Sequence, residues 1–143
     1  MLTNGNVRVT DGAPCYMPTA DMIGMPAEAD FLTSGDWFAT FTHELTHWTS
    51  HSTRCNRELG KRFGDAKYAA EELVAELGAA LVCSTFGVES SPQADHAQYV
   101  AHWLGALKAD PSLLWTAGTA AEAAVKHLTG LVAPVVAEDA VEA

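Results

Sequence analysis

Cysteine is scarce in this chain of 143 residues, which contains only three. Cys15, Cys55 and Cys83 are scattered and form no C-x-x-C pair, so the pattern offers no cysteine zinc site. This use of cysteine is typical of proteins kept in a reducing compartment. We therefore expect a cytoplasmic protein.

Positive charge is also scarce, because 8 Lys and Arg stand against 18 Asp and Glu, a formal net charge of −10. A surface this acidic repels phosphate backbones, so we expect no direct nucleic-acid binding. No apolar run approaches the roughly 18 residues that a membrane span requires, so we expect no membrane partner. The N-terminal MLTNGNVRVTDG has neither the basic nor the apolar segment of a signal peptide.

Apolar residues, in contrast, are plentiful, at 48% of the chain. A chain of this size can bury one real core, so we expect a single globular domain over residues 1–130. The remaining stretch, LVAPVVAEDAVEA at residues 131–143, is acidic and short, and we expect a disordered tail there.

The N-terminal quarter is predicted to be extended and the rest helical, an α+β arrangement. Short extended segments at 7–9, 15–17 and 21–25 predict a small antiparallel sheet of two or three strands. About four helices follow, each with a start or stop signal: from Ser34 or Asp36 to Ser50, 65–86 ending at Gly87, 91–108 after Ser91-Pro92, and 110–130 after Asp110-Pro111.

The stretch HELTHWTSH begins at His43 in the first predicted helix. His43 and His47 are four residues apart and share one helical face, so both imidazoles can bind one ion. Glu44 can then hold and deprotonate a water bound to that ion. The alternative interpretation is an ordinary solvent-exposed helical face that carries histidines.

A catalytic zinc ion usually has three protein ligands and one open position. His51 continues the pattern, but on a straight helix it lies about 6 Å beyond His47 along the axis. Ligand bonds of about 2 Å cannot bridge that span. We therefore expect His51 outside the ligand set, facing substrate or solvent.

The second long helix supplies a better third ligand, in YAAEELVAELGAAL. Glu72 and Glu76 share one face of this apolar helix, and Glu71 is expected to point elsewhere, into solvent. Buried carboxylates need a partner, which a cation supplies. One acid would bind the metal while the other orients a histidine, and either could hold either role. The alternative is that both acids pair with Arg54, Arg57 or Lys61.

Four segments together resemble a known family: DMIGMP, WFATFTHELTHWTSH, FGDAKYAAEELVAELGAALVC and HAQYVAHWLGALKADPSLL. The chain, from Tyr16 to Leu128, looks like the zincin-like metallopeptidase domain of polyvalent proteins and of ArdC-type antirestriction proteins, found also in TraC-like primases. Family members often read HWTGH and RLNR where this chain has Ser50 and Arg54-Cys55-Asn56-Arg57. These departures leave the ligand positions intact.

The resemblance implies a zincin core, a Zn²⁺ cofactor and peptidase chemistry on a protein or peptide substrate. By position His43, His47 and an acid of EELVAE match the metal ligands, and Glu44 matches the catalytic base. The gluzincin-like spacing E-x-x-x-E implies Glu72 as the ligand and Glu76 as its supporting residue. ArdC-type proteins, carried by plasmids and phages, protect incoming DNA from restriction. They also have an N-terminal single-stranded-DNA-binding domain, which we do not expect within these 143 residues.

The predicted reaction is hydrolysis of a peptide bond by a zinc-activated water, with Glu44 as the general base. Candidate donors to the oxyanion are Tyr68, His96 and His102, each of which could instead be structural. Segment 21–25 is a candidate edge strand for the substrate. Two rival functions remain: a catalytically silent zinc-binding domain that inhibits a host defence enzyme by binding it, and an acidic mimic of DNA.

Overall fold

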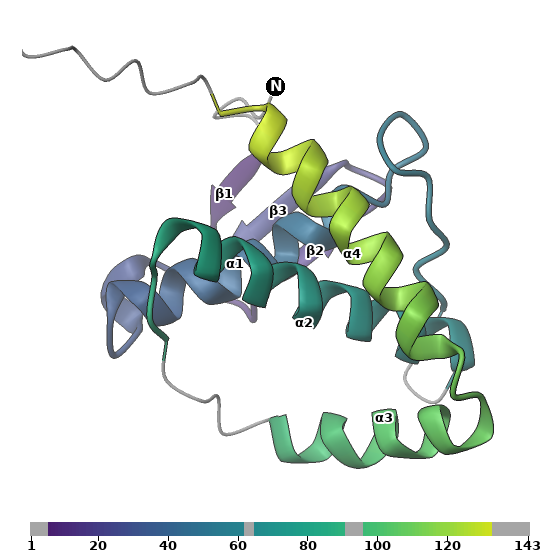
Figure 1. Ribbon diagram of the computed structural model, residues 1–143. Coiled ribbons are helices and arrows are strands. Elements are labelled where there is room, and N and C mark those ends of the chain that lie inside the picture. The colour runs from purple at the N-terminus through teal and green to yellow at the C-terminus, as the bar shows by residue number, and fades with distance from the viewer. Residues whose placement is uncertain (1–5, 62–64, 91–95, 133–143) are drawn as a thin grey trace, which may run out of the picture.

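The computed structural model describes residues 6–61, 65–90 and 96–132, and for 96–99 it describes the backbone alone. Within these residues, three short strands precede four helices, and α2 lies at the centre of the helical layer (Figure 1). This confirms the predicted α+β class. In chain order the elements are β1 (Val7–Val9), β2 (Cys15–Met17), β3 (Met22–Met25), the short 3-10 helix η1 (Glu28–Asp30), α1 (Ser34–Trp48), α2 (Ala66–Phe86), α3 (His96–Ala109) and α4 (Leu113–Gly130).

The sheet is mixed, which corrects the expectation that all its strands are antiparallel. Its order is β1-β3-β2, with β3 antiparallel to β2 and parallel to β1. The five residues between β1 and β2 can span the roughly 10 Å of two strand spacings, which leaves room for β3 between them. The expectation that 21–25 is an edge strand is therefore also wrong: β3 is central, and β2 is an edge.

Helix α1 is held at its start by Thr33, not by Ser34 or Asp36 as predicted. The Thr33 hydroxyl accepts a hydrogen bond from the backbone N–H of Asp36 at 3.0 Å and donates to the Asp36 carboxylate at 2.8 Å. The Thr33 hydroxyl thereby satisfies one free N–H of the first turn, as an N-cap residue does, while the Asp36 carboxylate holds that hydroxyl in place. The helix ends at Trp48, two residues before the expected Ser50.

Helix α2 begins within one residue of the predicted start and ends at the predicted stop, Gly87. The Asp65 carboxylate accepts from the backbone N–H of Lys67 at 2.9 Å, and Gly87 adopts the left-handed conformation at φ 65°. α2 packs against α1, α3 and α4, which explains why it is apolar almost all round. At Gly78 the two metal-site helices approach closely, since a Cβ there would lie 2.6 Å from Thr46 Cγ2.

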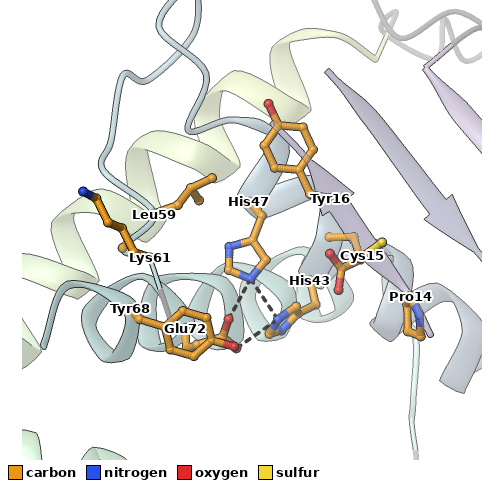
Figure 2. A pocket seen from close by; sticks show the side chains of 11 residues that line it. Pro14, Cys15, Tyr16, His43, His47, Leu59, Lys61, Tyr68 and Glu72 are labelled. Carbon is orange, nitrogen blue, oxygen red and sulfur yellow. Dashed lines mark hydrogen bonds and ion pairs between the residues drawn. The ribbon is translucent and has the colours of Figure 1, made fainter. Parts of the chain in front are cut away.

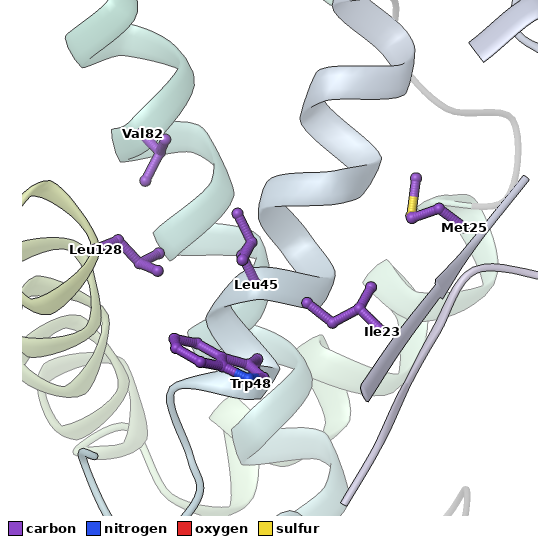
Figure 3. Close-up of a cluster of buried hydrophobic side chains, with 6 residues drawn as sticks. All are labelled: Ile23, Met25, Leu45, Trp48, Val82 and Leu128. Atoms are coloured by element: carbon purple, nitrogen blue, oxygen red, sulfur yellow. The ribbon is translucent and has the colours of Figure 1, made fainter. Parts of the chain in front are cut away.

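The main core lies between the sheet, α1, α2 and α4 (Figure 3). Helix α1 supplies Leu45 and Trp48 to it, and the rings of Trp37 and Phe41 stack beside it at 5.0 Å between centroids. The opposite face of α1 is thereby turned toward β2 and the first turns of α2. The buried members drawn in Figure 3 are Ile23, Met25, Leu45, Trp48, Val82 and Leu128.

The last two helices complete the layer. Before α4, the Asp110 carboxylate accepts from both the backbone N–H and the hydroxyl of Ser112, at 3.0 and 2.6 Å, so the helix starts at Leu113, later than predicted. The predicted cap at Ser91-Pro92 and the tail at 133–143 lie outside the described residues. Among the helices that are described, none combines the length and apolarity of a membrane span.

Candidate metal centre

Three side chains from α1 and α2 converge on one point (Figure 2). His43 Nε2 lies 3.5 Å from one carboxylate oxygen of Glu72, and His47 Nε2 lies 3.3 Å from the other. The two Nε2 atoms are themselves 3.2 Å apart. One ligand atom from each residue falls within 4.8 Å of the others, as donors to a single ion must.

A separate carboxylate stands behind each imidazole. His43 Nδ1 lies 3.3 Å from Glu76 Oε1, and His47 Nδ1 lies 3.3 Å from Glu71 Oε1. A carboxylate that accepts the Nδ1–H bond keeps a proton on Nδ1, so an imidazole that gives up its second proton to bind an ion would direct the Nε2 lone pair at the common point. This is the arrangement in which a histidine binds a metal.

The electrostatics of the cluster favour positive charge at that point. Burial alone would lower the pKa of His43, but hydrogen bonds to Glu72 and Glu76 outweigh it and raise the pKa to about 10. The pKa of His47 is raised in the same way, against burial, by Glu71 and Glu72. The pKa of Glu72 is lowered because its hydrogen bonds to both histidines outweigh its own burial.

The three converging side chains fit a divalent metal ion. Two imidazole nitrogens and one carboxylate oxygen form a donor set used by catalytic zinc sites and accepted by other divalent transition metals. The donors approach from the two helices only. On the remaining side they open into a pocket of about 300 Å³, which leaves a coordination position for water or substrate.

The pocket brings together residues that are far apart in the sequence. Glu44, the predicted base, lines it beside both histidines although its side chain is largely buried. Edge strand β2 forms one wall through Cys15 and Tyr16. The opposite wall comes from the loop after α1 and the first turn of α2, with Leu59, Gly60, Lys61 and Tyr68.

The prediction for Glu71 was wrong. It does point away from the face of Glu72 and Glu76, but its side chain is only 3% exposed, where solvation was expected. Arg57 and His47 both bond to it. A buried carboxylate in an apolar helix is stable only with such partners, and both come from segments distant in sequence.

Among the described residues, Arg54, Arg57 and Lys61 are not the partners of Glu72 and Glu76 that the alternative had expected. Arg57 binds Glu71, and Arg54 binds Asp21 through two hydrogen bonds. Glu72 lies beside both histidines, and Glu76 lies beside His43.

The other predicted site residues are placed as follows. Tyr68 lines the pocket. His51 lies outside the cluster, but because α1 ends before it, not because a straight helix carries it away; its Nδ1 lies 2.8 Å from the Thr53 hydroxyl. Among described side chains, none from α3 lines the pocket, which leaves His102 apart from it; the side chain of His96 is outside the description.

Nothing in the sequence indicated that Tyr16 lies at the site, and Arg57 and Lys61 were indicated only as alternative partners of Glu72 and Glu76. The spacing of Arg54 and Arg57 after the metal helix was the available signal for Arg57, but its partner Glu71 could not be read from it. Tyr16 is fixed by a hydrogen bond that its hydroxyl donates to Asp21, and burial with that carboxylate raises the pKa of Tyr16 to about 12.

The chain is similar in sequence to a known family and to proteins of known name. Residues 2–120 match the model of a family described as zincin-like metallopeptidase. Over 107 residues the chain is 38% identical to a DNA primase TraC of Escherichia coli and 36% identical to the protein y4eC of Sinorhizobium fredii. Each match covers 75% of this chain but only 10% of TraC and 35% of y4eC.

Two crystal structures of the antirestriction protein ArdC from plasmid R388 are similar to most of this chain. The Mn(II)-bound form has a TM-score of 0.75 at 38% identity, covering 89% of this chain and 48% of ArdC. The metal-free form has a TM-score of 0.73 at 41% identity, covering 87% and 45%. The predicted likeness to ArdC-type proteins is thereby confirmed, for a chain that spans about half of ArdC.

Proposed function

This chain belongs to the zincin-like metallopeptidase family, and we propose that it hydrolyses peptide bonds as a zinc-dependent peptidase with Glu44 as general base. One observation carries the proposal: the Nε2 atoms of His43 and His47 and the Glu72 carboxylate converge at the floor of an open pocket that Glu44 also lines. A metal site with a purely structural role would be closed by a fourth protein ligand.

His43, His47 and Glu72 are the residues that would hold the ion. Two neutral imidazoles and one carboxylate suit Zn²⁺, and the Mn(II)-bound form of ArdC supports a divalent cation in this kind of site. A bound Zn²⁺ would polarise the scissile carbonyl and lower the pKa of a water molecule.

Glu44 supplies the proton transfers. Its carboxylate, next in sequence to His43, lies in the pocket wall, where it can accept a proton from the attacking water and deliver it to the leaving amine. Tyr68 lines the same pocket, and its hydroxyl is the candidate donor to the oxyanion.

Edge strand β2 provides the docking line for a peptide. One side of β2 pairs with β3, while Cys15 and Tyr16 of β2 line the pocket. An extended peptide can add to such an edge through main-chain hydrogen bonds, which would lay its carbonyl groups along the metal site. This takes over the role that the sequence had suggested for β3.

The proposed partner is a protein substrate and not nucleic acid. The formal charge of −10 opposes phosphate, and a site that accepts an extended backbone needs no base recognition. The likeness to ArdC and TraC supports a role for the domain in a protein of a mobile element, with a host protein as its substrate.

The test combines metal content with turnover. Purified protein would be loaded with Zn²⁺, analysed by plasma mass spectrometry, and assayed on a library of internally quenched peptides beside Glu44→Gln. We expect both proteins to hold about one ion and the variant to lose about 10²- to 10⁴-fold in turnover.

Two results would contradict the proposal in different ways. Full metal occupancy with no cleavage of any peptide by the unsubstituted protein would favour a catalytically silent binding domain. Absence of metal would remove the zinc centre itself and leave an acidic DNA mimic as the rival.

A further inference from the structure

Arg57, in the loop after α1, donates hydrogen bonds to one carboxylate and to residues at the end of α1. Its Nε and Nη2 donate to the two oxygens of Glu71, at 2.9 and 2.8 Å. Its Nη1 donates to the Thr49 hydroxyl at 2.9 Å, and Nη2 also reaches the Thr46 carbonyl at 2.8 Å. A planar guanidinium bound in this bidentate way sets both the position and the plane of the carboxylate.

Glu71 joins this arginine to the metal ligands. Its Oε1 atom accepts from Arg57 and lies 3.3 Å from His47 Nδ1, and its side chain is almost fully buried. A carboxylate fixed in this way fixes in turn the ring plane and the tautomer of His47. Without Arg57, the buried charge of Glu71 would have only the His47 imidazole as its partner. An underpaired buried charge costs free energy, so the Glu71 side chain would move out of this position.

We propose that Arg57 is a positioning residue of the metal centre, acting on His47 through Glu71 and thereby setting the affinity for the ion. The inference rests on the metal site of the proposed function but does not require turnover. It also ties the loop after α1 to the site, because Arg57 holds Glu71 and the last turn of α1 together.

Arg54 provides a matched control on the same loop. It is equally buried, forms a bidentate pair with Asp21 and donates to the Trp48 carbonyl at 2.7 Å. Its guanidinium also stacks over the ring of Trp48 at 3.7 Å. Within the described residues, Arg54 and Asp21 bond to Tyr16 of the pocket wall but not to His43, His47 or Glu72, so loss of Arg54 costs a comparable set of contacts without releasing His47.

The experiment measures binding of Zn²⁺ and Mn²⁺ by titration calorimetry on chelator-treated protein, with thermal unfolding recorded in EDTA. We expect Arg57→Ala to weaken the affinity about 10- to 100-fold, the range found for loss of an outer partner of a ligand. Arg54→Ala should lower the unfolding temperature by a similar amount yet change the affinity less than about threefold. The visible spectrum of bound Co²⁺ should shift in Arg57→Ala alone.

A second pair of variants separates the effect of Arg57 on His47 through Glu71 from a general loss of structure. Arg57→Ala should have little further effect in a Glu71→Gln background, because both changes break one chain of contacts. If Arg57→Ala does not fold, Arg57→Lys serves instead, since it keeps the charge and loses the bidentate geometry; weakened affinity at an unchanged unfolding temperature supports the proposal. Equal effects of the two arginines, additive effects with Glu71→Gln, or unchanged affinity would each overturn it.

Discussion

His43 and His47 present the same atom to the same point, but their surroundings differ. Behind His47 lies Glu71, 3% exposed and bound by Arg57; behind His43 lies Glu76, 25% exposed. A buried, braced ligand keeps its geometry whether or not an ion is present, whereas one supported by a more exposed carboxylate can adjust. We therefore regard His47 as the fixed side of the centre and His43 as its adjustable side.

The largest effect is expected for Glu72→Ala, which removes the carboxylate that lies beside both His43 and His47. Both Nε2 atoms lose their common carboxylate, so Zn²⁺ affinity should fall by more than the roughly 100-fold upper range for outer partners. Calorimetry on chelator-treated protein measures this, with the exposed Glu122→Ala as control. Full retention of zinc in Glu72→Ala would mean that another acid completes the site.

The next change tests the asymmetry itself. Glutamine at position 71 or 76 keeps an acceptor oxygen but removes the charge that holds the Nδ1 proton. We expect about 100-fold weaker zinc binding for Glu71→Gln and about 10-fold for Glu76→Gln, the two ends of the range for such partners. Equal losses, or the reverse order, would dismiss the distinction between a fixed and an adjustable side.

A smaller effect is expected at Gly78 of α2, which packs against Thr46, the residue before His47. Gly78→Ala would place a Cβ 2.6 Å from Thr46 Cγ2 and 2.7 Å from its Oγ1, forcing α1 and α2 apart. The control is Gly118→Ala in α4, which has nothing within 4 Å of the new methyl group.

In urea unfolding the Gly78 variant should be about 1–3 kcal/mol less stable than the Gly118 variant, the usual cost of overpacking. Adding Thr46→Ala should recover much of this loss, because the clash is with that side chain. A Gly78 variant as stable as the control would show that the contact relaxes freely.

The smallest effect is expected for the ion pair between Arg54 and Asp21, which does not support the metal ligands. The hydrogen bonds from Arg54 hold the pKa of Asp21 below its ordinary value. A lowered folded pKa means that the pair stabilises the fold above the unfolded pKa of about 4, and that this contribution is lost as the pH falls through the folded pKa.

Urea midpoints in EDTA should therefore favour the unsubstituted protein over Asp21→Asn at pH 7, with the gap closing toward pH 3. A gap that is constant with pH would mean that shape, and not charge, accounts for the pairing of Asp21 with Arg54.

Much of the fold follows from local signals. The extent of α2 and its stop at Gly87 depend on a few neighbouring residues, and the structure has them where they were predicted. The strand order was not predictable in this way, because a five-residue connection allows either a hairpin or a gap that another strand fills. That choice decided which strand, β2 and not β3, faces the pocket.

By itself the sequence determined that His43 and His47 share a face with Glu44 beside them, since spacing along one helix settles this. It also limited the third donor to the acids of α2. Only the tertiary structure decided that Glu72 reaches both rings, that Glu76 stands behind one and Glu71 behind the other, and that Arg57 braces Glu71. These outcomes depend on how α2 is rotated against α1 and on which distant side chains neutralise a buried charge, and no local pattern encodes either.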